Sequence, residues 1–117
     1  MADNKQYITQ NQENGAVMIS EEVIATIVTN AITDVEGVVS IGTAKTNLER
    51  KLWNKGIKIT ISETNDVSID CNIVVAYGTA VVTVAAAVQE AAASAVEAMT
   101  GIKPIAINVN VIGIVRQ

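Results

Sequence analysis

The sequence predicts an α+β fold in which two helices cover one face of a mixed β-sheet, forming a two-layer sandwich. The first observation is a change of apolar period. Residues 67–77 alternate as a half-buried strand does, and residues 81–99 repeat as one face of a helix does. The second observation is that another alternating run, residues 105–115, follows this helix. Strand, helix and strand in this order indicate a β-α-β unit, in which a helix packs on a sheet.

The predicted order of elements is β-α-β-β-β-α-β. A short apolar run at residues 16–19 is the first strand, and Ser20 then caps a helix whose first turn is acidic. The apolar positions of this helix share one face from Ile24 to Val35, and Gly37 is expected to end it. Residues 38–41 return as a strand.

Residues 42–56 are predicted to be irregular, with one short helical turn. The strands at residues 57–62 and 67–77 then form an antiparallel hairpin, since the residues between them are turn formers. Thr79 is expected to cap the long helix. Gly101 is expected to end it in the left-handed conformation.

The chain has 117 residues, which fits one domain. Residues 1–14 are polar and contain no apolar core of a signal peptide, so we interpret them as a flexible tail and residues 15–117 as a single α+β domain. Half of the residues are hydrophobic, but there is no Phe and only one Trp. Large ligand pockets are usually lined by aromatic side chains, so we expect no cofactor.

The sequence contains few of the residue types and motifs that catalysis usually requires. The chain contains no His, which removes the commonest general base and metal ligand. Its one cysteine, Cys71, lies in mid-strand among apolar neighbours and is expected to be a small buried hydrophobe. No phosphate-binding loop or metal-ligand spacing is present. We therefore expect no enzyme, no catalytic residues and no metal site. A single thiol and the lack of an export signal favour the cytoplasm.

Residues 71–89 raise the question of a membrane-spanning helix, because these 19 positions are uncharged. The period changes from two to 3.6 within the stretch, whereas a spanning helix would keep one period throughout. We therefore expect a protein that does not insert into the membrane directly.

Charge is distributed unevenly along the chain. Residues 43–58 carry five cations and one acid, a local charge of +4, and the remaining residues carry −8. A basic segment on an acidic body favours association with an acidic surface. The candidate partner-binding residues are Lys45, Arg50, Lys51, Trp53 and Lys55. The alternative is that Leu48, Leu52 and Trp53 pack under a loop whose charges are only solvated.

The outward side of the long helix has two interpretations as well. Glu90 and Glu97 share it with Ala86 and Ala93. The simpler interpretation is a solvent-exposed face. The other is a packing face for a second chain, because small residues allow close approach of two backbones.

Seven short motifs occur in this order over residues 15–115: Gly15–Ile24, Val35–Val38, Lys55–Ile59, Tyr77-Gly78, Val88-Gln89, Thr100-Gly101 and Val109–Gly113. Together they resemble the alkaline-shock, or general-stress, protein family of Gram-positive bacteria. The resemblance implies a non-enzymatic, abundant cytoplasmic protein linked to cell-envelope stress. It also implies self-association and, for some members, attachment to a membrane-anchored partner protein.

The function expected from these observations is that of an interaction protein. It would form homo-oligomers and dock to partners near the cytoplasmic side of the cell envelope. The alternative is an RNA- or nucleotide-binding regulatory module. The overall acidity weighs against nucleic-acid binding, as does the absence of a GXXG loop or an aromatic RNA-binding strand.

Overall fold

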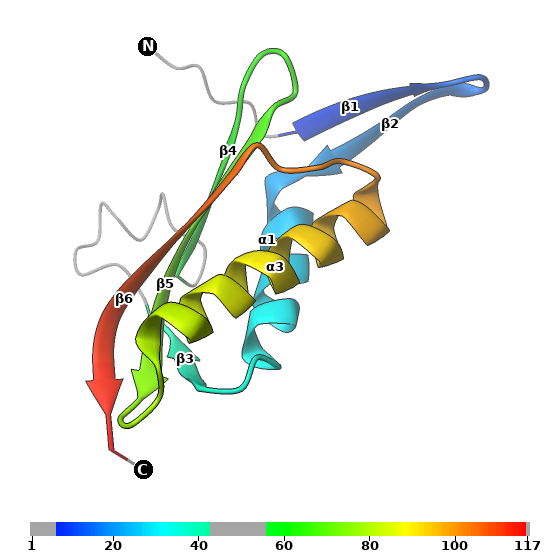
Figure 1. The fold of residues 1–117 in the computed structure, drawn as a ribbon. Coiled ribbons are helices and arrows are strands. Elements are labelled where there is room, and N and C mark those ends of the chain that lie inside the picture. The colour runs from blue at the N-terminus through cyan, green and yellow to red at the C-terminus, as the bar shows by residue number, and fades with distance from the viewer. Residues whose placement is uncertain (1–6, 43–55, 117) are drawn as a thin grey trace.

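A helix layer packed on one face of a β-sheet dominates the computed structural model, which describes residues 7–42 and 56–116 (Figure 1). This arrangement confirms the α+β class. The elements in chain order are β1 (Tyr7–Gln12), β2 (Gly15–Ser20), α1 (Glu21–Thr33), β3 (Val38–Ile41), β4 (Ile57–Ile61), β5 (Val67–Ala76), α3 (Val81–Thr100) and β6 (Ala106–Val115).

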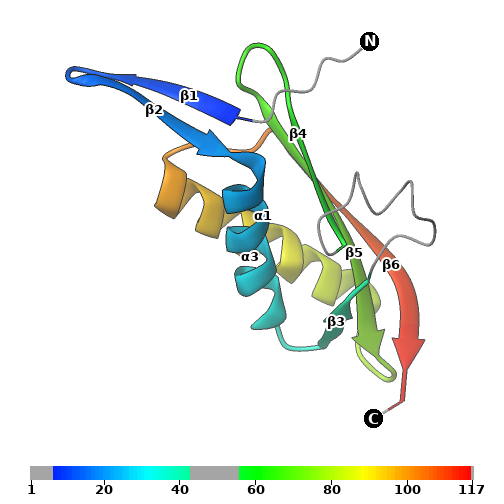
Figure 2. The same ribbon diagram turned by 180° about the vertical axis from the view of Figure 1, so that it is seen from behind.

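The main sheet is organised around β5. Strands β3 and β4 both pair with one edge of β5 in antiparallel orientation, and β6 pairs with the other edge in parallel orientation. The sheet is therefore mixed, and β5, α3 and β6 form the β-α-β unit that the change of period predicted. Seen from behind, α1 lies in front of α3 and the sheet extends along one side of the two helices (Figure 2).

Strands β3 and β4 follow one another along the same edge of β5, so they act as a single strand with an interruption. The interruption lies opposite Asn72. The Asn72 amide donates to the Gly56 carbonyl at 2.9 Å, and the Asn72 carbonyl accepts from the Gly42 amide at 2.7 Å. Gly42 and Gly56 therefore lie beside one another at the edge of β5, opposite Asn72.

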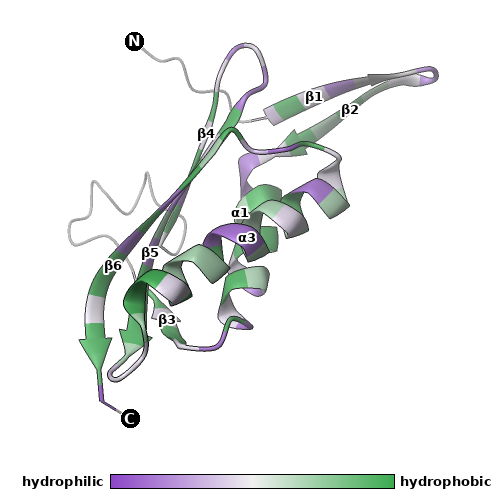
Figure 3. Cartoon of the chain, viewed as in Figure 1, coloured by the Kyte–Doolittle hydropathy of each residue, from purple (hydrophilic) through white to green (hydrophobic). Residues whose placement is uncertain are grey.

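The core lies between the sheet and the two helices. Alternate residues of β5 from Val67 to Val75 are fully buried, and the intervening residues are half-buried on the opposite face. From the helices, the buried residues recur every fourth position: Ile24, Val28 and Ile32 in α1, and Val84, Val88, Ala92 and Val96 in α3. Hydrophilic positions interrupt the hydrophobic ones along the surface of α3 (Figure 3).

The spacing of four residues explains how the helices meet. Rows of side chains at i and i+4 on two helices interdigitate when the axes cross at about 50°. Helix α1 packs against α3 and also covers β3 and β4, whereas α3 covers β6. The small side chains of α3 let the two helices approach closely over the β-branched residues of the sheet.

Residues 7–12 correct the expectation of a flexible tail over residues 1–14. They form β1, which pairs with β2 in a hairpin separate from the main sheet. Ile8, only 1% exposed, anchors the hairpin in the core, and the Gln10 side-chain amide donates to the Thr100 carbonyl at 2.7 Å. The far end of the hairpin extends beyond the helices in both ribbon views (Figures 1 and 2).

The helix ends agree with the sequence at two positions and differ at two. Ser20 caps α1, and Gly101 ends α3 with φ of 77°, as expected. Helix α1 ends at Thr33 rather than near Gly37, because Asp34 takes the C-cap position. Thr79 does not cap α3, since its hydroxyl donates backward to the Ala76 carbonyl at 2.7 Å.

Gly56 is expected to be indispensable at the interruption between β3 and β4. Its φ is +87°, and a Cβ built on it would lie 1.6 Å from the Gly42 carbonyl oxygen. Gly56→Ala should lower the free energy of unfolding by about 3 kcal/mol, because a left-handed alanine is strained and the backbone must also move. Urea denaturation measures this change.

Gly78→Ala is the matched control. Gly78 also has a positive φ, +96°, but nothing lies within 4 Å of its Cβ position. This variant should lower the free energy of unfolding by only about 1 kcal/mol, which is the cost of holding an alanine in the left-handed conformation. Equal losses in the two variants would show that the close approach of Gly56 to Gly42 has no energetic weight.

Candidate functional site

The described residues hold no arrangement typical of a catalytic or metal centre. Within residues 7–42 and 56–116, no group of three or more His, Cys, Asp or Glu side chains could hold a metal ion. Asp66 and Asp70 each accept a hydrogen bond from another side chain, and Lys58 lies opposite Asp70 in the register of β4 and β5. Asp66 accepts a hydrogen bond from the Thr64 hydroxyl in the β4–β5 turn, and Asp70 accepts one from Asn108. These carboxylates are used in local structure.

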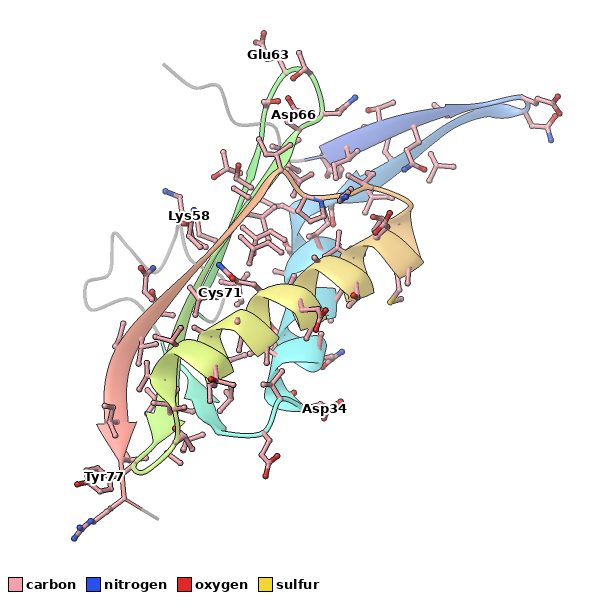
Figure 4. All side chains as sticks on the ribbon, in the orientation of Figure 1. Asp34, Lys58, Glu63, Asp66, Cys71 and Tyr77 are labelled. Carbon is pink, nitrogen blue, oxygen red and sulfur yellow. The ribbon has the colours of Figure 1, made fainter. Side chains whose placement is uncertain are left out.

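Cys71 occupies the buried face of β5, as the sequence indicated. Its side chain is fully buried, within the core formed by the sheet and the helices (Figure 4). Burial, and secondarily the nearby Asp70 carboxylate, raises the pKa of the Cys71 thiol to about 12. A thiol in this state is a poor nucleophile, because the thiolate is the reactive form.

The sequence-based binding residues lie outside the described residues: Lys45, Arg50, Lys51, Trp53 and Lys55. Of the basic segment at residues 43–58, the structure describes only the end. Lys58 lies on the outer face of the sheet, away from the helices (Figure 4), where its partner in register is Asp70. The proposal that this segment binds a partner therefore remains a prediction from charge.

The outer face of the sheet is polar along its centre. The Asn108 side chain donates to the Asp70 carboxylate at 3.0 Å, and the Asn110 side chain donates to the Asn72 side-chain oxygen at 3.1 Å. These bonds join β5 to β6 across two successive rungs of the ladder. The two hydrogen bonds therefore stabilise the parallel pair of strands.

An open groove of about 640 Å³ lies on the helix layer, between α1 and the C-terminal part of α3. Its apolar residues are Val23, Ile27, Ala31, Ala95 and Met99, and its polar residues are Ser20, Glu22, Thr26, Asn30 and Asp34. Ile27 is buried, while Val23 is 48% and Met99 72% exposed. The groove is thus an apolar surface open to solvent.

Among the described residues that line this groove, called the α1–α3 groove below, the charged side chains are both acidic. Glu22 lies in the first turn of α1. Asp34, labelled in Figure 4, is the C-cap residue at the opposite end of this helix. The pKa of the adjacent Glu21 is raised by burial and by the Glu22 carboxylate. No basic residue occurs in the last turn of α1, so Asp34 lies beside helix carbonyls of the same sign. Neither helix contains Lys or Arg.

Sequence reasoning missed this groove. The signal was present, because Val23, Ile27 and Ala31 recur at a spacing of four on α1 and lie beside the core-facing row. The apolar face predicted from Ile24 to Val35 does not include Val23. Only the packing of α1 on α3 shows that part of it remains uncovered.

The surface of α3 agrees with the expectation for its outward side. Glu90, Glu97 and Ala86 are exposed and Ala93 is half-buried. The uncharged stretch at residues 71–89 divides into the end of β5 and the start of α3, as the change of period required. Among the described helices, α3 alone is long and apolar enough to cross a membrane, and 22% of its most apolar window is buried.

A second apolar surface lies near the end of β6. Its exposed members are Tyr77, Ile112, Ile114 and Val115. The Arg116 guanidinium lies 5.0 Å from the centroid of the Tyr77 ring, within the range of a cation–π contact. Only one edge of β6 pairs with a described strand. The end of the sheet therefore presents both apolar side chains and an edge that no described strand covers.

The chain is similar in sequence to a known protein family. A sequence model of the alkaline-shock protein family, described as having a cell envelope-related function, matches residues 9–116. The uncharacterized protein Spy1535 of Streptococcus pyogenes serotype M6 is 32% identical over 105 residues, which cover 88% of this chain and 81% of that protein. No solved structure matches. The span matched by the family includes both helices and all described strands except the first residues of β1.

Cys71 is expected to react slowly with thiol reagents in the folded protein. With a pKa near 12 instead of about 9, the thiolate fraction at pH 8 falls about a thousandfold, and burial lowers access further. Labelling of native and urea-unfolded protein measures this difference. Rapid labelling of the native protein would contradict a structural role.

The raised pKa of Cys71 also predicts a dependence of stability on pH. Because the folded pKa lies above the unfolded one, the thiol's contribution is fully present below about pH 9 and is lost as pH rises toward 12. Cys71→Ala should cost about 1 kcal/mol at pH 7, as small core truncations do. The cost should shrink above pH 9. A cost that does not change between about pH 7 and pH 10.5 would argue against the shift.

Proposed function

The chain belongs to the alkaline-shock protein family, whose function is related to the cell envelope, and from that membership we propose that it is a non-catalytic interaction protein of the envelope stress response. It forms homo-oligomers and docks to partner proteins at the cytoplasmic side of the envelope. The observation that carries this proposal is the extent of the family match, which covers residues 9–116 and thus nearly the whole folded unit.

The residues exposed on the surface support a role in binding rather than catalysis. Asp66 and Asp70 are bonded in a turn and a ladder, and the one thiol is buried. Exposed apolar side chains gather instead in the α1–α3 groove and at the end of β6. Such surfaces on a small rigid unit are typical of proteins that act by contact.

Self-association is supported by opposite charges within one chain. Of its 8 Lys and Arg and 12 Asp and Glu, only 3 cations and 10 acids belong to the described residues, which therefore carry −7. Residues 43–55 carry four cations and one acid. The basic segment of one copy and the acidic body of another attract each other, and this attraction accelerates encounter.

Association with the envelope is proposed to be peripheral, through a partner. The apolar helix α3 has a row of five buried residues that closes the core, and carries Glu90 and Glu97 on its exposed side. Removing it from the sheet would expose β5, so insertion of α3 into a bilayer would destroy the fold described above. A separate membrane-bound protein is the simpler means of attachment.

Carbonate extraction tests the peripheral attachment. Expressed in a host that lacks any partner, the protein should stay in the soluble fraction without detergent, because its longest apolar helix is needed for the core. Membrane and soluble fractions are compared by immunoblot. Retention in carbonate-washed membranes of that host would refute the proposal.

Reversal of the basic segment tests its role in self-association. The triple variant Arg50→Glu, Lys51→Glu and Lys55→Glu should weaken self-association or partner capture by about tenfold, mainly through the association rate. Single exposed ion pairs contribute only about 0–1 kcal/mol, so one substitution should have little effect. Sedimentation velocity at low and high salt measures the change, because salt screens such contacts over about 10 Å at about 0.1 M.

A charge-matched control separates the segment from overall charge. Lys5→Glu with Lys103→Glu, compared with Arg50→Glu with Lys51→Glu, reverses the same number of cations elsewhere and should leave association nearly unchanged, with circular dichroism confirming the fold of both variants. A wild type that is monomeric at every salt concentration excludes self-association through this segment. Normal partner capture by the basic-segment variant would show that the segment is only a solvated loop.

A further inference from the structure

We propose that the α1–α3 groove is the docking site for an amphipathic helix of a partner protein, with cationic residues flanking its apolar stripe. This inference rests on the proposed function, since it specifies the partner that the docking role requires. The argument uses the shape of the groove, its apolar lining and the sign of its charge.

The shape of the groove fits a helix. Its α1 wall runs from Ser20 to Asp34, and about 14 residues of α-helix rise about 21 Å. This length equals roughly four turns of a second helix laid alongside. Helices bind such grooves by placing apolar residues at i, i+3, i+4 and i+7 against the floor.

The lining supplies the contacts that an apolar stripe needs. Ile27 belongs to the core, Ala95 of α3 packs against the core, and Ala31 is half-buried in the same groove. Val23 and Met99 are exposed at the margins, and Met is a flexible side chain that adapts to a partner's shape. A ligand helix would cover these two side chains, which otherwise remain in contact with water.

The acidic residues at the two ends of the groove favour a partner helix with cationic residues beside its apolar stripe. Glu22 at one end and Asp34 at the other have no cation near them in either helix sequence. At Asp34 the carboxylate and the helix C-terminus have the same sign, so a Lys or Arg placed there interacts favourably with both. At the other end, a cation would relieve the repulsion between Glu21 and Glu22. An acidic or neutral helix would gain neither interaction.

The test uses fluorescence anisotropy with a labelled peptide of about 16 residues, long enough for about four helical turns, in which Leu occupies one helical stripe and Lys the flanks. Two control peptides are used, one with Glu in place of every Lys and one with the same composition but no helical period. The Lys peptide should bind the full-length protein about tenfold or more tightly than either control. Equal binding of the period-free peptide would overturn the proposal.

Variants of the protein locate the site. Glu22→Gln with Asp34→Asn should weaken peptide binding about tenfold, whereas Glu90→Gln with Glu97→Gln, the same charge change outside the groove, should alter it less than about twofold. Val23→Ser should weaken binding about fivefold, and Val82→Ser, an exposed valine elsewhere, should not. Equal effects of the two charge pairs would mean non-specific attraction and would refute the site.

Sedimentation velocity of the same variants distinguishes a second copy as occupant. If the groove variants abolish self-association but leave peptide affinity unchanged, the groove is a contact between copies and this inference fails, while the proposed function stands. If the wild type never self-associates but binds the peptide as described, the inference holds and the self-association part of the proposed function fails. Thermal unfolding followed by circular dichroism confirms that each variant is folded.

Discussion

The two-sided strand β5 is the constraint on which the rest of the structure depends. Its edges are occupied by β3 and β4 on one side and by β6 on the other, and its alternate residues form the floor of the core. A shift of its register by one residue would bury Ser68, Asp70 and Asn72 and expose the apolar set. Burying a carboxylate without a partner is costly, so the charge of Asp70 fixes the register as firmly as the hydrophobic residues do.

The helix layer follows from this floor and also creates the surface available for binding. Residues spaced by four on α1 and α3 seat the helices on the β-branched sheet, and the same spacing makes the axes cross. Crossing helices cannot remain in contact along their whole length. The α1–α3 groove lies along α1 and beside the C-terminal part of α3, so a surface open to a partner adjoins the helix contact that stabilises the fold.

Sequence reasoning reached the order of the main elements because their periods are strong. The alternation of β5 predicts a strand and the wide apolar face of α3 predicts a helix. Both elements were predicted with nearly the bounds observed. Strand β1 was missed because Ile8 is the one fully buried residue among its described side chains at residues 7–10, and one residue produces no period. The Asn14-Gly15 dipeptide is a hairpin signal that could have revealed it. The groove could not be predicted, since it depends on which part of an apolar stripe the neighbouring helix leaves uncovered.

The meeting of Gly42 and Gly56 beside Asn72 has a consequence for how this fold changes over time. The two ends of the intervening chain are held together by the sheet, so loop-closure entropy rises only slowly with the number of residues between them. Lengthening or replacing that stretch therefore leaves the register of β3 and β4 intact. Members of one lineage can acquire different recognition sequences at this point without redesigning the fold, and an engineer could place a reporter domain there for the same reason.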